Sequence, residues 1–299
     1  MIFNSVEFLI FLPIVFLIYW KLLNHNLKAQ NFFVLAASYL FYGWWDWRFL
    51  SLIIISTLSD FIIGQLLEKQ EEKKKRKLLL WASIVVNIGI LGFFKYYNFF
   101  IENFITAFQS LNIELHHSTL QVILPVGISF YTFQTLSYTI DIYRGKLKSA
   151  KDPIAFFAFV SFFPQLVAGP IERASNLLPQ FQSSRKFDYK TATDGLRQIL
   201  WGMFKKVVIA DNCAPFVNDI FSQHAELSGS TLLIGAVLFA FQIYGDFSGY
   251  SDIAIGTARI FGFNLMKNFA YPYFSRDIAE FWRRWHISLS SWFRDYVYI

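Results

Sequence analysis

Long apolar runs recur along the whole chain and restrict it to a membrane fold. They lie at about 6–23, 31–45, 49–67, 78–100, 121–140, 154–169, 196–211 and 231–258. A helix needs about 20 apolar residues to cross a bilayer, so the shorter runs predict tilted, broken or re-entrant elements. The chain is 55% hydrophobic and 16% charged, which is more apolar than a soluble domain of 299 residues requires. We predict an all-α, polytopic integral membrane protein.

The cations are concentrated in short loops between these runs, which is the pattern that orients membrane helices. Residues 69–77, 144–151 and 173–190 are basic, whereas 101–120 and 211–230 contain no Lys or Arg. Basic loops remain in the cytoplasm, so the N-terminus is predicted outside and the tail from Arg259 inside. We interpret 69–77 as a topology signal, with anionic lipid or a carrier protein as alternative partners. The net charge of +6 therefore does not indicate nucleic-acid binding.

The run 154–169 does not fit a simple crossing, because basic loops flank it on both sides. It contains Pro164 and ends at the pair Gly169-Pro170, so we predict a re-entrant or buried interior element. Irregular backbone at that depth must be enclosed by protein or line a wet cavity, which predicts a cavity facing the cytoplasm. Neither an internal repeat nor a Gly- or Pro-rich linker divides the sequence, so we predict a single domain over 1–299.

Metal and cofactor motifs are missing from the sequence. The single cysteine, Cys213, cannot form an intrachain disulfide, and His116-His117 is predicted to lie in a surface loop. We predict neither a metal site nor a bound cofactor. Nucleophile-elbow, Walker A and dinucleotide-binding motifs are also absent, which argues against an esterase, ATPase or dehydrogenase.

His286 is the strongest candidate for chemistry. It follows Arg283, Arg284 and Trp285, close to an apolar run that carries two aspartates. Ionisable groups at membrane depth are costly and tend to mark function, and a neutral imidazole is the usual general base near neutral pH. A histidine on an apolar face can equally be a packing residue, and composition alone favours that alternative.

The second candidate group lies in the stretch Gln242–Asp252 and comprises Asp246, Ser248, Tyr250 and Asp252. Asp246 and Tyr250 are four residues apart and would share a helix face, and Gly245 and Gly249 would open a face to close packing. The carboxylates need partners, and the nearest in sequence are Arg283, Arg284 and His286. The alternative is a packed helix whose polar groups bond neighbouring backbone.

Two further polar groups remain ambiguous. Glu172 or Arg173, after Gly169-Pro170, could point into a cavity or form a solvated salt bridge after a helix stop. The second group follows Pro125 at helical spacing and comprises Gln134, Tyr138 and Asp141. It could line a cavity, or it could be a packing stripe with an Asp141–Arg144 pair.

The candidate residues belong to a set of distinctive segments: 1–5, Tyr39–Trp47, Leu124–Gly145, Phe162–Arg173, Trp201–Asn212, Phe241–Gly256 and above all Asn268–Ile299. Together these segments resemble the membrane-bound O-acyltransferase family, in its bacterial alginate O-acetyltransferase branch. The resemblance implies a helical fold around a central funnel in the bacterial inner membrane. It also implies transfer of an acyl group from acetyl-CoA or another thioester, including an acylated carrier, to exported polysaccharide. Periplasmic or membrane accessory proteins and membrane lipid are the implied partners.

Two histidines characterise that family, and His286 matches the first. The second, which the resemblance implies is the catalytic base, is expected downstream of Ile299, so the resemblance implies an N-terminal fragment that is inactive alone. His286, Arg283, Arg284 and Asp246 would then shape the cavity and stabilise developing charge. A transporter or flippase for a glycan or lipid precursor, or a non-catalytic scaffold of an export complex, are the alternatives.

Overall fold

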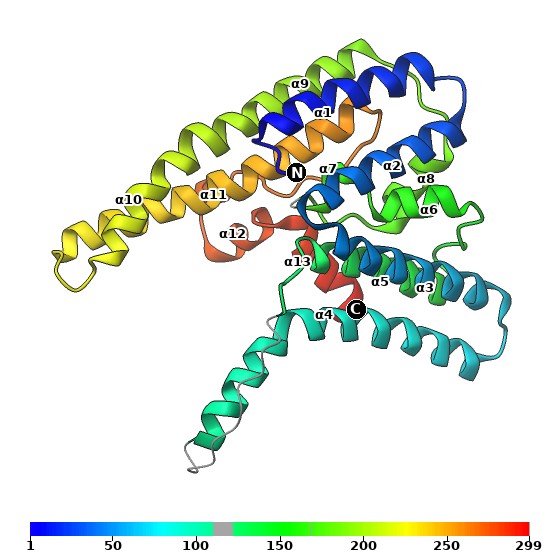
Figure 1. Cartoon of the computed structure of the whole chain (residues 1–299), viewed down its shortest axis with the longest axis horizontal. Helices are drawn as coiled ribbons and strands as arrows, with labels where there is room; N and C mark the ends of the chain where they lie inside the picture. The colour runs from blue at the N-terminus through cyan, green and yellow to red at the C-terminus, as the bar shows by residue number, and fades with distance from the viewer. Residues whose placement is uncertain (110–121, 168, 299) are drawn as a thin grey trace.

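The computed structural model describes residues 1–109, 122–167 and 169–298, and over those ranges the chain is helical, without strands (Figure 1). The first half contains α1 (Val6–Leu17), η1 (Ile18–Leu22), α2 (Leu27–Asp46), η2 (Trp47–Phe49), α3 (Leu50–Lys69), α4 (Lys73–Gln109) and α5 (Ile128–Tyr143). It is followed by α6 (Pro153–Val160), α7 (Phe163–Leu166), α8 (Ala174–Gln182), α9 (Tyr189–Met203), η3 (Phe204–Ala210), α10 (Asp211–Ser222) and α11 (Gly229–Ile260). The last elements are η4 (Pro272–Phe274), α12 (Ile278–Arg284), α13 (Ile287–Phe293) and η5 (Arg294–Tyr298). The predicted all-α class is confirmed, and the predicted loop at His116-His117 lies outside the described residues.

Three helical segments in the described ranges are long and apolar enough to cross a membrane: Leu27–Lys69, Lys73–Gln109 and Gly229–Ile260. They contain four of the predicted runs, at 31–45, 49–67, 78–100 and 231–258. The predicted run 121–140 begins too early, since α5 starts only at Ile128. Gly127 makes the turn before it with φ 77°, where the Leu166 carbonyl leaves no space for a Cβ atom.

The helices α9, η3 and α10 follow one another along one side of α11 and form a long hairpin with it (Figure 1). Glycines on both arms bring the backbones together, because a Cβ built on Gly202 would lie 2.6 Å from the Gly249 carbonyl oxygen. Gly195 and Gly256 face each other in the same way, and Gly245 lies against the Lys205 carbonyl. The prediction that Gly245 and Gly249 allow close packing is therefore confirmed.

The extent of this hairpin corrects the predicted loop at 211–230. Residues Asp211–Ser222 form helix α10, so only 223–228 connect the two arms. The segment is too polar to register as an apolar run. Two of its apolar side chains nevertheless pack on the other arm, where Ile220 and Phe221 lie against Gly235. Packing on a partner helix outweighs composition here.

The run 154–169 folds as the predicted broken interior element. Helix α6 ends at Val160, α7 begins at Phe163, and both are largely buried. Side chains from other helices satisfy the backbone groups that the break releases. Gln134 Nε2 donates to the Phe159 carbonyl at 2.8 Å, and the Ser38 hydroxyl accepts from Phe163 N–H at 3.1 Å.

The polar stripe on α5 is a packing stripe, which decides between the two alternatives left open above. Besides Gln134, the Tyr138 hydroxyl accepts from Ala150 N–H at 2.9 Å. The expected Asp141–Arg144 pair is wrong: Asp141 accepts from the Tyr296 hydroxyl at 2.9 Å, and Arg144 donates to the Asp295 carbonyl.

A second carboxylate is enclosed completely between α3, α4 and α5. Asp60 is 0% exposed and accepts from the Ser83 hydroxyl at 2.6 Å and from Asn87 Nδ2 at 2.7 Å. The network continues through Asn87 Oδ1, which accepts from the hydroxyls of Ser56 and Thr135. These bonds connect three helices at a depth where water cannot satisfy their polar groups.

Candidate functional site

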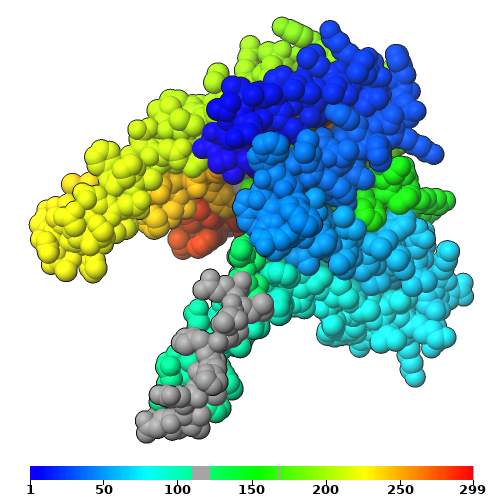
Figure 2. All heavy atoms as spheres, in the orientation of Figure 1, coloured from blue at the N-terminus to red at the C-terminus, as the bar shows by residue number. Residues whose placement is uncertain are grey.

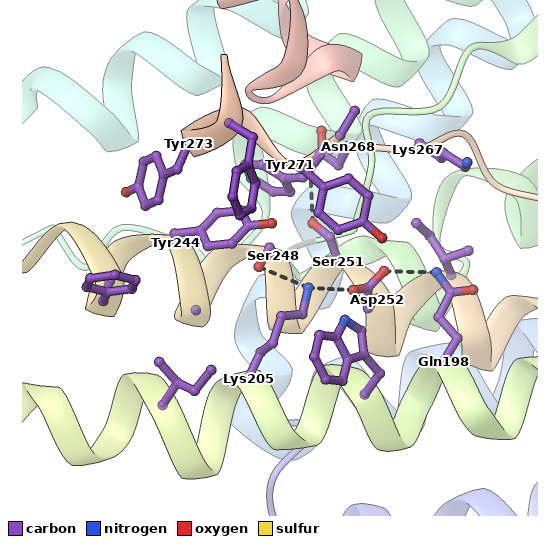
Figure 3. A pocket seen from close by; sticks show the side chains of 18 residues that line it. Gln198, Lys205, Tyr244, Ser248, Ser251, Asp252, Lys267, Asn268, Tyr271 and Tyr273 are labelled. Carbon is purple, nitrogen blue, oxygen red and sulfur yellow. Dashed lines mark hydrogen bonds and ion pairs between the residues drawn. The ribbon is translucent and has the colours of Figure 1, made fainter. Parts of the chain in front are cut away.

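A cavity of about 740 Å³ lies between the α9–η3 arm, α11 and the segment 267–274 (Figure 3). This volume falls within the range of small-ligand sites, roughly 300–1,000 Å³. Its polar lining comes from Gln198, Lys205, Ser248, Ser251, Asp252, Lys267 and Asn268, and its aromatic lining from Trp201, Phe241, Tyr244, Phe269, Tyr271, Tyr273 and Phe274. The cavity therefore combines apolar walls with a few convergent polar groups.

Lys205 and Asp252 form an ion pair at the polar side of the cavity (Figure 3). Lys205 Nζ lies 2.5 Å from Asp252 Oδ2 and donates to the Ser248 hydroxyl at 3.0 Å. Gln198 Nε2 donates to the other carboxylate oxygen at 2.9 Å, while Gln198 Oε1 is buried without a partner in the described residues. The two charges compensate each other, so the cavity presents hydrogen-bonding groups without a net charge from this pair.

The aromatic wall is tied to α11 by one hydroxyl. Tyr273 donates to the Ala240 carbonyl at 2.6 Å, and its ring lies 5.1 Å from that of Tyr244. Trp285, a predicted cavity residue, is behind this wall, edge-on to Phe269 at 5.0 Å. It supports the cavity lining without being part of it.

His286 also lies behind Phe269, at the start of α13. Its ring contacts Phe247 edge-on at a centroid distance of 4.7 Å and lies parallel to Phe269 at 6.5 Å. The Nε2 atom is buried and has no hydrogen-bond partner among the described residues. Burial lowers the pKa of the imidazole to about 4, so the ring is neutral near pH 7. A neutral ring with a free Nε2 can accept or donate one proton.

Asn268 fixes the position of His286. It is 0% exposed, donates to the Ser251 hydroxyl of α11 at 3.1 Å, and accepts from the Ser288 hydroxyl at 2.8 Å. Its carbonyl accepts from Ile287 N–H at 2.9 Å. His286 itself has φ 43°, an unfavourable backbone conformation for a residue with a side chain. The surrounding bonds hold it there.

Asp246 and Tyr250 share a helix face, as predicted, but that face points away from the cavity. Lys206 lies between them: its Nζ is 2.7 Å from Asp246 Oδ1 and 5.4 Å from the Tyr250 ring centroid. Lys206 also pairs with Asp211. The expected partners Arg283, Arg284 and His286 are therefore wrong for both aspartates, because the lysines of η3 occupy that role.

Both arginines lie outside the cavity lining. Arg284 pairs with Glu280 at 2.5 Å, and its carbonyl accepts from Ala270 N–H. Arg283 is exposed and makes no side-chain bond within the described ranges. Arg284 therefore has a structural role, because its backbone carbonyl holds residue 270 against the end of α12.

Glu172 and Arg173 stabilise the fold at a distance from the cavity. Glu172 is 0% exposed and accepts from Asn176 Nδ2 at 2.6 Å and from Met266 N–H. Burial raises the pKa of its carboxyl group. Arg173 pairs with Asp295 at 2.7 Å. Neither the cavity nor the solvated-bridge alternative describes Glu172, which connects α8 to the segment before Lys267.

Sequence reasoning missed Lys205, Gln198 and Asn268. Lys205 could have been found, because it interrupts the apolar run 196–211 and the rule that singled out the aspartates applies to it equally. Gln198 and Asn268 carry no comparable signal, since amides occur at many packing positions.

The fold and this cavity define a polytopic helical membrane protein with a ligand-sized cavity. The sequence model of MBOAT, the membrane-bound O-acyltransferase family, matches residues 147–299, which is just over half of the sequence. The chain belongs to the membrane-bound O-acyltransferase family.

Three curated relatives indicate the range of that family. The chain is 42% identical to a probable alginate O-acetylase AlgI of Pseudomonas syringae pv. tomato, over all of this chain and 57% of that protein. It is 35% identical to a peptidoglycan O-acetyltransferase of Helicobacter pylori, over all of this chain and 61% of that protein. It is 32% identical to a teichoic acid D-alanyltransferase of Bacillus subtilis, over 62% of this chain and 47% of that protein. The chain thus spans about three-fifths of the length of the first two relatives.

Proposed function

We propose that the protein is a bacterial inner-membrane O-acyltransferase that moves an acetyl or other acyl group from a thioester donor to a hydroxyl of an exported polysaccharide. The three relatives are named for acyl transfer to alginate, peptidoglycan or teichoic acid. Acetyl-CoA or an acylated carrier is the proposed donor, alginate is one proposed acceptor, and accessory proteins of the envelope are proposed partners.

One observation carries this proposal: the buried Nε2 of His286, which has no partner among the described residues, lies behind the Phe269 wall of a cavity with convergent polar groups. In the transfer, the acceptor hydroxyl oxygen bonds to the thioester carbonyl carbon, and the carbon–sulfur bond breaks. The hydroxyl proton passes to a base, and the leaving sulfur takes up a proton. A neutral imidazole with a free nitrogen suits a hydrogen bond to one of these reacting groups.

The polar side of the cavity would orient the substrate. Lys205 is already held by Asp252 and Ser248, so it cannot reorganise freely when a ligand enters. Gln198 Oε1 is free to accept a hydrogen bond from a ligand donor. Fixed polar groups of this kind lower the cost of orienting a substrate.

The test is an acetyl-transfer assay on a protein extended to the full length of its relatives, with His286→Ala and with His224→Ala as control. His224 is exposed and does not line the cavity. We expect His286→Ala to lower kcat by about 10²–10⁴-fold with the fold intact, the usual range for loss of an acid or base. Unchanged kcat would refute the role of His286. Movement of a glycan or lipid without acyl transfer would favour a transporter.

The 299-residue chain should be assayed alone as well. The family resemblance implies a second, catalytic histidine, and none of His25, His116, His117 and His224 matches it, so we expect no turnover from this chain by itself. Acetyl transfer by the purified chain would contradict that expectation while leaving the proposed reaction in place.

A further inference from the structure

The structure joins two basic segments that are far apart in sequence, 69–77 and 144–151. Arg76 makes the first connection. Its Nη1 donates to the carbonyls of Leu67 and Gln70 at 2.6 and 3.2 Å, at the end of α3. Its Nη2 donates to the carbonyls of Ile142 and Tyr143 at 3.3 and 2.9 Å, at the end of α5. One guanidinium thereby fixes two chain reversals against each other.

Glu68 makes the second connection. Its carboxylate accepts from Ser149 N–H at 3.2 Å and from the Ser149 hydroxyl. The neighbouring Ala150 N–H donates to Tyr138. The segment after α5 is therefore held along the end of α3, and both basic segments lie along the same edge of the molecule, on the right in Figures 1 and 2.

These segments form one cationic surface, which we call the basic surface. Its exposed cations are Lys69, Lys73, Lys74, Lys75, Lys77, Arg144, Lys146, Lys148 and Lys151. The acids between them are Glu68, Glu71, Glu72 and Asp152, so nine cations against four acids leave +5 of the chain's +6. Among the described residues only Lys75 of these cations has an ion-pair partner, Glu72 at 2.8 Å. The surface thus concentrates nearly all of the net charge.

The position of the basic surface identifies the kind of ligand. It lies where two segments long enough to cross a membrane, Leu27–Lys69 and Lys73–Gln109, come together. Directly along α4 from the lysines, Leu78, Trp81 and Val85 are 54–70% exposed. An exposed apolar face with a tryptophan near its end is typical of lipid contact at the membrane interface. Cations beside such a face are at headgroup level.

We propose that the basic surface binds the phosphate headgroups of anionic phospholipids, whose acyl chains lie along the exposed face of α4. Lysine suits this role, because its flexible stem follows apolar surface while its ammonium group reaches the headgroups. An acidic soluble protein would match the charge but not the adjoining apolar face. The inference does not depend on the proposed acyl transfer.

The test compares reconstituted protein in phosphatidylcholine nanodiscs with and without phosphatidylglycerol. The readouts are Tm and the number of phosphatidylglycerol molecules retained in native mass spectrometry. We expect phosphatidylglycerol to raise Tm, and the shift to shrink at high salt, because headgroup attraction is screened. Two separate variants, Lys73→Gln/Lys74→Gln and Lys146→Gln/Lys148→Gln, should each lose part of the shift and of the retained lipid.

A matched control removes the same number of charges elsewhere, in Lys21→Gln/Lys28→Gln and Lys186→Gln/Lys190→Gln. These variants should keep the wild-type response to phosphatidylglycerol. The proposal is overturned if the control variants lose as much as the surface variants, or if both lipid compositions give the same Tm. Binding of an acidic polypeptide such as polyglutamate, without retention of phosphatidylglycerol, would also overturn it.

Discussion

Two carboxylates at membrane depth, Asp60 and Asp252, have opposite surroundings. Within the described part of the chain, Asp60 has only neutral partners, chiefly Ser83 and Asn87, and it is fully enclosed between α3, α4 and α5. Asp252 is paired with a cation, Lys205, and borders a cavity of about 740 Å³. An ionisable residue in a membrane span is thus not by itself a functional site. Whether such a residue forms a functional site depends on the groups around it and on its access to a cavity.

The difference follows from how each cluster is completed. Around Asp60, neighbouring hydroxyl and amide groups supply its hydrogen-bond donors, so the network is complete within the protein. Around Asp252, one amide oxygen at the cavity wall, Gln198 Oε1, has no partner in the part of the chain that the structure describes. A complete network contributes to stability, whereas an incomplete one beside a cavity can bond a ligand.

The largest expected effect is that of Lys205→Met. It leaves Asp252 charged and largely buried with only Gln198 as partner, which typically costs about 3–5 kcal/mol. The measurement is denaturant unfolding in detergent micelles. Acyl transfer in the protein extended to full length should also fall.

The double variant Lys205→Met/Asp252→Leu separates stability from function. Replacing both charges by apolar side chains removes the uncompensated carboxylate, so we expect most of the stability to return. Acyl transfer should stay low, because the cavity has lost its polar side. Recovery of transfer along with stability would show that this pair, like Asp60, only holds the fold.

The next effect in size is that of Asp60→Ala. It removes the carboxylate acceptor of the Ser83 hydroxyl and of Asn87 Nδ2, at a cost of about 1–3 kcal/mol for each group left unsatisfied. Asn87 Nδ2 keeps its bond to the Ser83 carbonyl, and the Ser83 hydroxyl keeps its contact with the Thr139 hydroxyl, so we expect the lower part of that range. Thermal unfolding measures the loss, and Asp60→Asn, which keeps the shape and one oxygen, should lose less. Acyl transfer per folded molecule should be unchanged for both. A specific loss of transfer in stable Asp60→Asn would contradict a purely structural role.

The sequence predicts the fold class, but it does not predict most of the difference between Asp60 and Asp252. The apolar runs predicted the helical membrane class, and the two flanking basic loops with Pro164 predicted the broken element between α5 and α8. Those features depend on local composition. Asp60 did not stand out, because a single aspartate in an apolar run does not reveal whether its neighbours are neutral or charged.

The predicted ion-pair partners of the α11 aspartates were wrong. Asp246 and Asp252 were assigned to Arg283, Arg284 or His286 by nearness in sequence, but their partners are Lys206 and Lys205 of the opposite hairpin arm. Which residues meet across α9 and α11 depends on the register set by the glycine contacts. A single sequence does not specify that register. His286 was singled out by its sequence context, but that its Nε2 is buried without a partner in the described residues follows only from the packing of Phe247 and Phe269.

A smaller effect on stability is expected from lowering the pH, and near the cavity this effect acts through His286. Unfolded, the imidazole has its ordinary pKa of about 6.5, whereas burial lowers the pKa in the folded protein to about 4. As pH falls from about 6.5 towards 4, the unfolded state binds a proton that the folded state does not, so stability decreases. Well above pH 6.5, His286 adds no pH dependence to the stability of the protein.

The difference between wild type and His286→Gln isolates this contribution from other titrating groups, among them Glu172. We expect the variant to lose less stability than wild type over that window in unfolding measured at several pH values. His224→Gln, at an exposed histidine, should follow the wild-type curve. Parallel curves of stability against pH for wild type and His286→Gln would show that protonating the ring in the folded protein costs no stability.

The smallest effect is expected from Tyr273→Phe, which tests whether the cavity wall is held as firmly as the Asp60 network. The change removes one hydrogen bond, to the Ala240 carbonyl, worth about 0.5–1.5 kcal/mol, from a half-exposed side chain. Because this bond ties the segment 267–274 to α11, its loss should raise KM for transfer while kcat stays near wild type. Tyr271→Phe removes a hydroxyl that has no bonded partner in the described residues, and should leave stability unchanged. A fall in kcat with constant KM in Tyr273→Phe would mean that the hydroxyl acts in the transition state, and the wall would then be part of the reacting machinery.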